Sequence, residues 1–150
     1  MHRVKSRALL LGGLIGLLAA CGEVPGGAAG ISGTVTAPAG GSVVDTDVFA
    51  CFTNEANCER LSLVTVQQTG TSADYRLISL PNGSYGVYGF KDVDDSGGAS
   101  NGDLYGYYST TPGVIGSVRP PAAGIDIEMS RLTGATPAPV RESLTKIISD

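Results

Sequence analysis

Short apolar runs separated by turn residues fill the chain from residue 31 to residue 132. Runs of about four to eight apolar or alternating residues, bounded by Gly, Pro, Asn or Ser, are typical of β-strands. Alternation is clearest from Ile125 to Ser130, where every second residue is apolar. The pattern predicts strands at residues 31–36, 47–52, 61–67, 75–80, 84–91, 104–109 and 124–132.

Between residues 31 and 132, the sequence lacks the apolar stripe of an amphipathic helix. Seven short strands in about 100 residues can bury their apolar faces only if two sheets share one core. The sequence therefore predicts an all-β domain at residues 31–132, folded as a seven-stranded antiparallel β-sandwich. The turn at Pro81–Gly83 fits this arrangement, because Pro fixes its own φ and Gly accepts a positive one.

Residues 133–150 follow a different pattern, that of a linker and a C-terminal tail. Residues 133–139 consist only of Gly, Thr, Ala and Pro, which is typical of a linker. After them, apolar residues recur at helical spacing, at Val140, Leu144, Ile147 and Ile148. A helix of about eleven residues is marginal by itself in water. We expect a tail that either docks as a short helix on the sandwich or is disordered.

The N-terminal 20 residues have the composition of an export signal. His2, Arg3, Lys5 and Arg7 precede an uncharged run from residue 8 to residue 20. This run is too short for the ~20 residues that a membrane-spanning helix needs. It predicts a secretory signal peptide at residues 1–20. Residues 21–30 are mostly Gly and Ala after the cysteine, which predicts a flexible tether.

The end of this signal, Leu18-Ala19-Ala20-Cys21, resembles the lipobox of bacterial lipoprotein precursors. The resemblance implies that Cys21 receives diacylglycerol before cleavage, so that palmitate-type acyl chains anchor the mature protein in a membrane. Gly22 stands where lipoproteins kept at the inner membrane carry aspartate. The resemblance therefore implies a bacterial cell envelope protein, in the outer membrane, facing the periplasm or the cell exterior. An ordinary signal peptide followed by a chance cysteine is the alternative.

Loss of residues 1–20 changes both the charge and the available chemistry. The whole chain has 10 Lys and Arg against 14 Asp and Glu, and the signal holds three of the basic residues, so the mature net charge is about −7. Such a surface is unsuited to nucleic acid, where Lys and Arg supply most of the affinity. The only histidine, His2, is also lost, which excludes Ser-His-Asp and Cys-His catalysis and histidine metal sites. We expect a protein that is not an enzyme and binds no nucleic acid.

Cys51 and Cys58 remain once Cys21 carries lipid. An even number of cysteines in an oxidising compartment predicts a disulfide, here across a turn between two strands. Closing a loop of this length contributes about 2.5 kcal/mol in the chain-entropy model. The alternative is a reduced pair.

The segment from Asp92 to Asp103 has the ligand spacing of an EF-hand-type loop. Calcium takes six to eight oxygen ligands in a tight turn, and Gly97 permits that turn. The closing aspartate also resembles that of dockerin-type loops. The alternative is a solvated, Gly-rich hairpin loop. The expected Ca²⁺ ligands are Asp92, Asp94, Ser96, Gly98 through its backbone carbonyl, Ser100 and Asp103.

Aromatic residues cluster on both sides of this loop. Tyrosine has a flat apolar face and a polar tip, so these side chains are candidates for a sugar or peptide platform. The alternative is that they are ordinary strand residues, half of them in the core. The expected ligand-binding residues are Tyr88, Tyr105, Tyr107 and Tyr108.

Two stretches of the domain resemble carboxypeptidase-regulatory-like and transthyretin (prealbumin)-like β-sandwiches. They are the start, Ile31-Ser-Gly-Thr-Val, and the centre, Tyr75-Arg-Leu-Ile-Ser-Leu-Pro-Asn-Gly-Ser-Tyr-Gly-Val. That resemblance implies a non-catalytic binding or structural module with a protein or polysaccharide partner in the envelope. The alternatives are a carboxylate-based hydrolase of envelope polysaccharide and an accessory subunit of an envelope complex.

Overall fold

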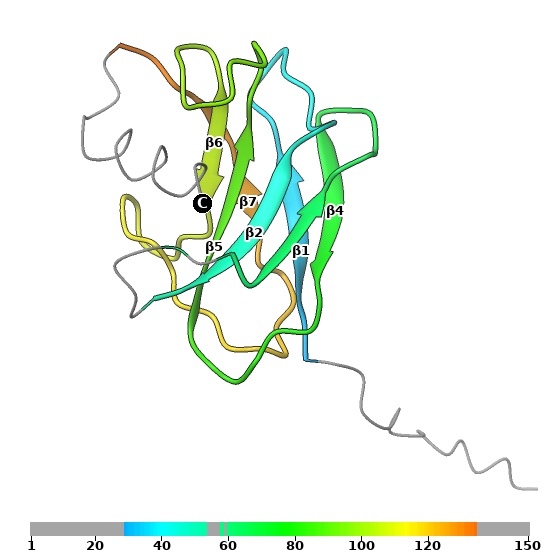
Figure 1. The fold of residues 1–150 in the computed structure, drawn as a ribbon, viewed down its shortest axis with the longest axis vertical. Coiled ribbons are helices and arrows are strands. Elements are labelled where there is room, and N and C mark those ends of the chain that lie inside the picture. The colour runs from blue at the N-terminus through cyan, green and yellow to red at the C-terminus, as the bar shows by residue number, and fades with distance from the viewer. Residues whose placement is uncertain (1–28, 54–57, 59, 135–150) are drawn as a thin grey trace, which may run out of the picture.

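The computed structural model describes residues 29–53, 58 and 60–134, and this part of the chain is all-β with no helix. It forms two sheets that pack as a sandwich (Figure 1). The strands are β1 (Ile31–Thr36), β2 (Asp47–Phe52), β3 (Ser62–Thr65), β4 (Ser72–Leu77), β5 (Tyr85–Lys91), β6 (Leu104–Tyr107), β7 (Ile127–Glu128) and β8 (Ser130–Arg131).

One sheet has the order β4-β1-β7 and the other the order β3-β2-β5-β6-β8. All pairs of neighbouring strands are antiparallel except β1 and β7, which are parallel and pair Val35 with Ile127. The predicted all-β sandwich is therefore confirmed, with one parallel pair in it.

The predicted strands at 31–36 and 47–52 agree with β1 and β2. The strand predicted at 75–80 begins and ends three residues earlier, as β4, because Ala73, Tyr75 and Leu77 are its buried positions. The chain then turns at Ser79, which has a positive φ of 60°.

The last predicted strand, 124–132, is divided between the two sheets. Its alternation is confirmed, since Ile125, Ile127 and Met129 are all buried. The hydrogen bonds change partner along it: the N–H of Met129 donates to Thr36 of β1, whereas that of Leu132 donates to Asp103, next to β6. The chain thus passes from one sheet to the other at Met129, which gives eight strands in the described residues instead of seven.

A glycine allows this segment to lie against β1. A Cβ on Gly33 would overlap the backbone of Ile125. The approach is fixed on both sides of Gly33, because the N–H of Ile125 donates to Ser32 and the N–H of Thr34 donates to Asp126 Oδ1 at 2.9 Å.

The main core lies between the two sheets. The inner face of the five-stranded sheet contributes Val48, Ala50, Tyr85, Val87 and Leu104, and the three-stranded sheet closes it with Ile31, Val35, Ala73, Tyr75, Leu77 and Ile127. These side chains alternate along each strand, as they must where one face of a strand meets the core.

The outer face of the five-stranded sheet carries a second buried cluster of Phe49, Cys51, Phe90 and Leu132. Strand register explains its composition, because Phe49 pairs with Tyr88 and Phe90 pairs with Tyr105. Strand β2 is therefore apolar on both of its faces.

Several predicted segments lie outside the described residues: the signal peptide at 1–20, Cys21 and most of the tether at 21–30, and residues 135–150 of the tail. Within the part of the chain that the structure describes, no helix has the length and apolar character needed to cross a membrane.

Candidate metal site and aromatic face

The loop predicted to bind calcium connects β5 to β6. These strands pair in antiparallel register, with Lys91 opposite Leu104, so the loop begins and ends at adjacent points of the sheet. All six expected ligands lie within this single loop.

Asp103 closes the neck of the loop. Its side chain is fully buried. Oδ1 accepts the N–H of Val93 at 2.8 Å and Oδ2 accepts the N–H of Ser100 at 2.6 Å. Because a buried carboxylate is costly unless it is hydrogen-bonded, these two bonds make Asp103 a structural element of the loop as well as a candidate ligand.

Asp92 organises the turn at the tip. Its Oδ2 accepts the N–H of Gly97 at 2.7 Å and its Oδ1 accepts the N–H of Ser96 at 3.2 Å. Gly97 has a φ of 78° and open space around its Cα, so the turn depends on its backbone conformation and not on close packing.

Asp94 is exposed and lies between two serines. Its Oδ1 accepts the N–H of Ser96 at 3.3 Å, and its Oδ2 accepts the hydroxyl of Ser100 at 2.8 Å. The side chain of Ser96 first, and that of Ser100 next, hold the pKa of Asp94 below its ordinary value, and the N–H of Ser96 adds to the effect. The Ser96 hydroxyl itself donates to the carbonyl of Gly98 at 3.2 Å.

The three carboxylates converge. Asp92, Asp94 and Asp103 each offer an oxygen, and these oxygens lie within 4.8 Å of one another. Carboxylate oxygens in such a group are the ligands that Ca²⁺ prefers. The group could hold a metal ion, and Ser96, Gly98 and Ser100 lie in the same hydrogen-bonded turn.

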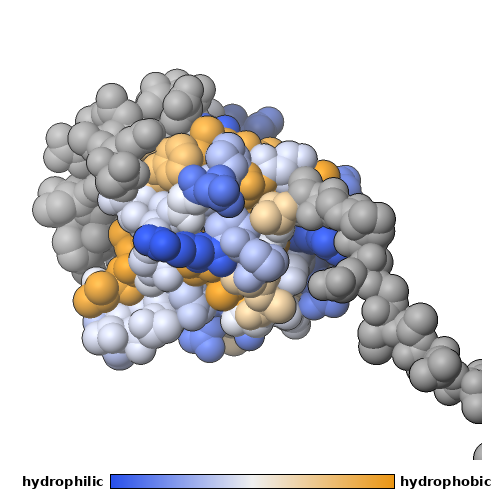
Figure 2. Space-filling model, turned by 90° about the horizontal axis from the view of Figure 1, so that it is seen from below, coloured by the Kyte–Doolittle hydropathy of each residue, from blue (hydrophilic) through white to orange (hydrophobic). Residues whose placement is uncertain are grey.

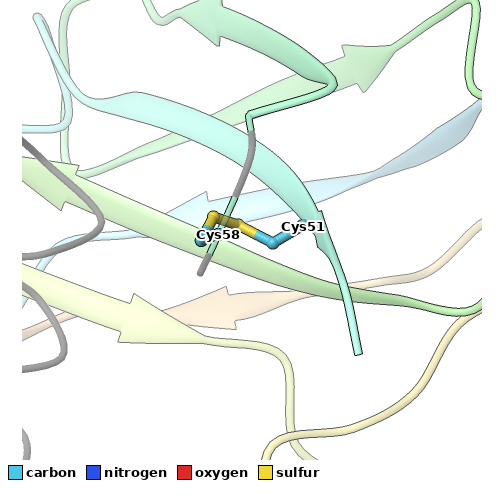
Figure 3. The surroundings of a disulfide bond; sticks show 2 residues. All are labelled: Cys51 and Cys58. Atoms are coloured by element: carbon cyan, nitrogen blue, oxygen red, sulfur yellow. A yellow bond between two sulfur atoms is a disulfide. The ribbon is translucent and has the colours of Figure 1, made fainter. Parts of the chain in front are cut away.

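Cys51 and Cys58 are joined as a disulfide with their Cα atoms 5.0 Å apart (Figure 3). This separation lies within the usual range for a disulfide. Cys51 belongs to β2 and points to the outer face of the sheet, where Cys58 packs against the buried cluster. The pairing predicted from cysteine number therefore fits the structure.

The four tyrosines expected to bind a ligand lie on two different faces. Tyr88, Tyr105 and Tyr107 share the outer face of the five-stranded sheet, with Tyr88 opposite Tyr107. Tyr108 instead packs against the main core. Alternation along the strand explains the difference, because neighbouring residues point to opposite faces.

The outer tyrosines are only partly accessible. Phe49 stacks on Tyr88 with ring centroids 5.7 Å apart, and the guanidinium of Arg60 lies over the Phe49 ring, 5.5 Å from its centroid. Burial raises the pKa of the Tyr88 hydroxyl. Tyr88, Tyr105 and Tyr107 are each half-buried, so each keeps part of its surface accessible on this face.

Phe49 and Arg60 also belong to this face and were not among the expected ligand-binding residues. The strand at 47–52 holds Val48, Phe49, Ala50 and Cys51 in succession, and an unbroken apolar run of this kind is typical of a strand buried on both sides. That run could have identified Phe49 as a residue buried on the outer face.

A separate open hollow of about 360 Å³ lies where the chain enters β1. Figure 2 views this end of the molecule and shows hydrophilic and hydrophobic residues intermixed there. The described residues that line the hollow include one charged side chain, Arg76, and no carboxylate. The described lining of the hollow therefore contains no acidic pair of the kind that glycoside hydrolysis requires.

Comparison of the chain with protein-family models, with curated proteins and with solved structures finds no match.

Proposed function

We propose that the chain is a non-enzymatic binding or structural protein of the bacterial envelope, anchored by lipid on Cys21, whose β-sandwich binds Ca²⁺ in the loop at residues 92–103. The observation that carries the metal site is the convergence of the Asp92, Asp94 and Asp103 oxygens within 4.8 Å. Like charges so close together repel one another, and a divalent cation reverses the sign of that interaction.

The hydrogen bonds of the loop set the strength of the proposed site. Asp92 and Asp103 accept backbone N–H groups of the loop, and these hydrogen bonds hold it in its closed conformation. The closing residue of the loop is Asp103, whose side chain is shorter than the bidentate glutamate of strong calcium sites. We expect a Kd of about 10⁻⁴ to 10⁻³ M, as in extracellular calcium modules.

The direction of the Asp94 pKa shift supports a cation ligand at this position. A general acid for glycoside cleavage needs a carboxyl with a raised pKa. The pKa of Asp94 is instead lowered by its serine neighbours. A carboxylate that stays ionised is suited to a cation.

Calcium titration of the mature protein, followed by calorimetry and by thermal unfolding, tests the metal site. At a calcium concentration ten times Kd the free energy of unfolding should rise by about 1.4 kcal/mol, which raises Tm by several degrees. Asp92→Asn and Asp94→Asn should each weaken this response.

The matched control is Asp95→Asn. Asp95 lies in the same loop and carries the same charge, but it is outside the converging group. Its φ of 57° is a conformation that Asn also adopts readily. An Asp95→Asn variant that loses the calcium response as fully as Asp92→Asn would refute a specific site, and so would the absence of heat and of a Tm shift in the native protein.

The anchor has an independent test. Cys21→Ser should leave the precursor unprocessed and move the protein out of the detergent phase in a detergent-partitioning assay. Cys51→Ser with Cys58→Ser is the control, because it removes thiols elsewhere and should leave partitioning intact. Unchanged partitioning of Cys21→Ser would contradict lipid anchoring without bearing on the calcium site.

A further inference from the structure

The outer face of the five-stranded sheet is buried although it faces away from the main core. Phe49 and Leu132 are each 1% exposed, and Phe90 is 6% exposed. A sheet face that meets solvent normally alternates to polar residues, so an apolar face of this kind requires a covering layer. Among the described residues, the partly buried Cys58, Tyr88, Ala99 and Tyr105 pack against this cluster, and Arg60 lies over Phe49.

The course of the chain indicates what completes the cover. Leu132 belongs to the buried cluster, and its N–H is fixed to Asp103 at 2.8 Å. The described residues end at Gly134, two positions later. The chain therefore leaves the sandwich at the outer face, with 16 residues, 135–150, still to follow.

Those residues have the pattern that such a face would bind. Val140, Leu144, Ile147 and Ile148 fall on one side of a helix, with polar residues such as Thr145 and Ser149 on the other. A helix of residues 140–150 would be about 16 Å long. Three adjacent strands span about 10 Å between the first and the last, so the helix can cross β2, β5 and β6.

The linker is long enough to place that helix. Residues 135–139 can extend to about 17 Å, enough to carry the chain from the edge at β8 to the centre of the sheet. Pro137 and Pro139 keep this stretch extended and disfavour helix before residue 140.

We propose that residues 140–150 form an amphipathic helix that docks on the outer face of the five-stranded sheet, with its apolar stripe against Phe49, Phe90 and Leu132. An isolated helix of this length is marginal, and docking supplies the stability that it lacks. The helix lies beside Tyr88 and Tyr105, so a partner that uses these tyrosines must first displace it. This inference is independent of calcium and of the lipid anchor.

A photo-crosslinking amino acid at position 144 of the otherwise native mature chain tests the location. Irradiation should join residue 144 to peptides of the same chain that contain β2 or β5, identified by mass spectrometry. The same probe at position 145, on the polar side, should give far less of this product. Crosslinks to the three-stranded sheet, or none to the sandwich, would overturn the proposal. Crosslinks only between two chains would assign the face to a second copy and overturn it as well.

The double variant Leu144→Asp, Ile148→Asp tests the energetics. It should lower the midpoint of denaturant unfolding and increase the fluorescence of anilinonaphthalene sulfonate, a dye that binds exposed apolar surface, several-fold. The control, Thr145→Asp with Ser149→Asp, adds the same charge on the opposite side and should change neither value. Equal behaviour of the two double variants would refute the docking. If the first variant fails to fold, the crosslinking experiment still decides.

Discussion

The two faces of the five-stranded sheet are both buried, but they are built differently. The inner face is mostly aliphatic and is closed by a second sheet that hydrogen bonds hold in place. The outer face is aromatic, carries the disulfide and has the side chains of Arg60 and Ala99 over it. The inner face therefore depends on strand pairing within the sandwich. The outer face depends on a crosslink, on loops and, in our proposal, on the C-terminal tail.

Large-to-small substitutions on the two faces should separate these dependences. Leu104→Ala on the inner face should lower the free energy of unfolding by about 2–5 kcal/mol, and Phe90→Ala on the outer face by about 3–5 kcal/mol. In the Leu144→Asp, Ile148→Asp background the cost of Phe90→Ala should fall, whereas that of Leu104→Ala should not change. Urea unfolding measures these free energies for Leu104→Ala and Phe90→Ala, each in the native chain and in the double-variant background, with the two parent proteins as references. An equal fall for both substitutions would contradict the distinction between the faces.

The disulfide should be the next largest contribution, and it belongs to the outer face. Cys51→Ala with Cys58→Ala should lower the free energy of unfolding by about 2 kcal/mol, because the unfolded chain gains the freedom of an open loop. Chemical unfolding without reductant measures the loss. Reductant should lower the stability of the native protein and leave the double variant unaffected. Two free thiols in the native protein, found by mass spectrometry, would refute the bond.

The inner core contains one polar atom whose replacement should be neutral or stabilising. Thr46 is fully buried, and its Oγ1 has no hydrogen-bond partner among the described residues. Thr46→Val keeps the shape and removes the unsatisfied hydroxyl, so the free energy of unfolding should rise by up to about 1 kcal/mol. Thr65→Val is the control, because the hydroxyl of Thr65 donates to Asp47 at 2.6 Å and its loss should destabilise. A Thr46→Val variant less stable than the native protein would reveal a partner for Oγ1.

The smallest effect concerns the acidic loop, where Ala99 packs against the outer face. The pKa of Asp94 is lower in the folded protein than its ordinary value. Its contribution to stability is therefore present above the ordinary pKa and is lost as pH falls through the folded pKa. Ser100→Ala should move this pKa upward, as measured by NMR titration without calcium. Ser117→Ala, at an exposed serine outside the loop, should not. If the pKa of Asp94 were unchanged in Ser100→Ala, the hydrogen bond from the Ser100 hydroxyl would be excluded as a cause of the lowered pKa.

Local patterns in the sequence predicted much of the fold. The strands at 31–36 and 47–52, and the alternation from Ile125 to Met129, depend on neighbouring residues and on burial, and both are visible in the sequence. The division of the last strand at Met129 was not predictable in this way. It arises because the N–H of Met129 donates to Thr36 in one sheet and that of Leu132 donates to Asp103, next to β6, in the other. A local sequence pattern does not show such distant partners.

The same distinction applies to the candidate site. Spacing alone placed Asp92, Asp94 and Asp103 in one loop, and the structure brings their oxygens together. Spacing did not show that Asp103 is buried and holds the neck of the loop, because that depends on Val93 and Ser100 N–H groups brought close by the fold. It also did not show that Tyr108 leaves the face of the other tyrosines, although strict alternation after Tyr107 predicts it.

The parallel pairing of β1 with β7 has a consequence for the order of folding. The N–H of Thr34 and the carboxylate of Asp126 are 92 residues apart in the chain, yet they bond side by side. Contacts between distant residues slow folding, since a long loop must close before they form. A chain that emerges N-terminus first can pair β1 with β4 early, but the three-stranded sheet stays incomplete until residue 127 is available. The first strand of the domain thus acquires its second neighbour only when one of the last strands forms, and β1 keeps an open edge until then.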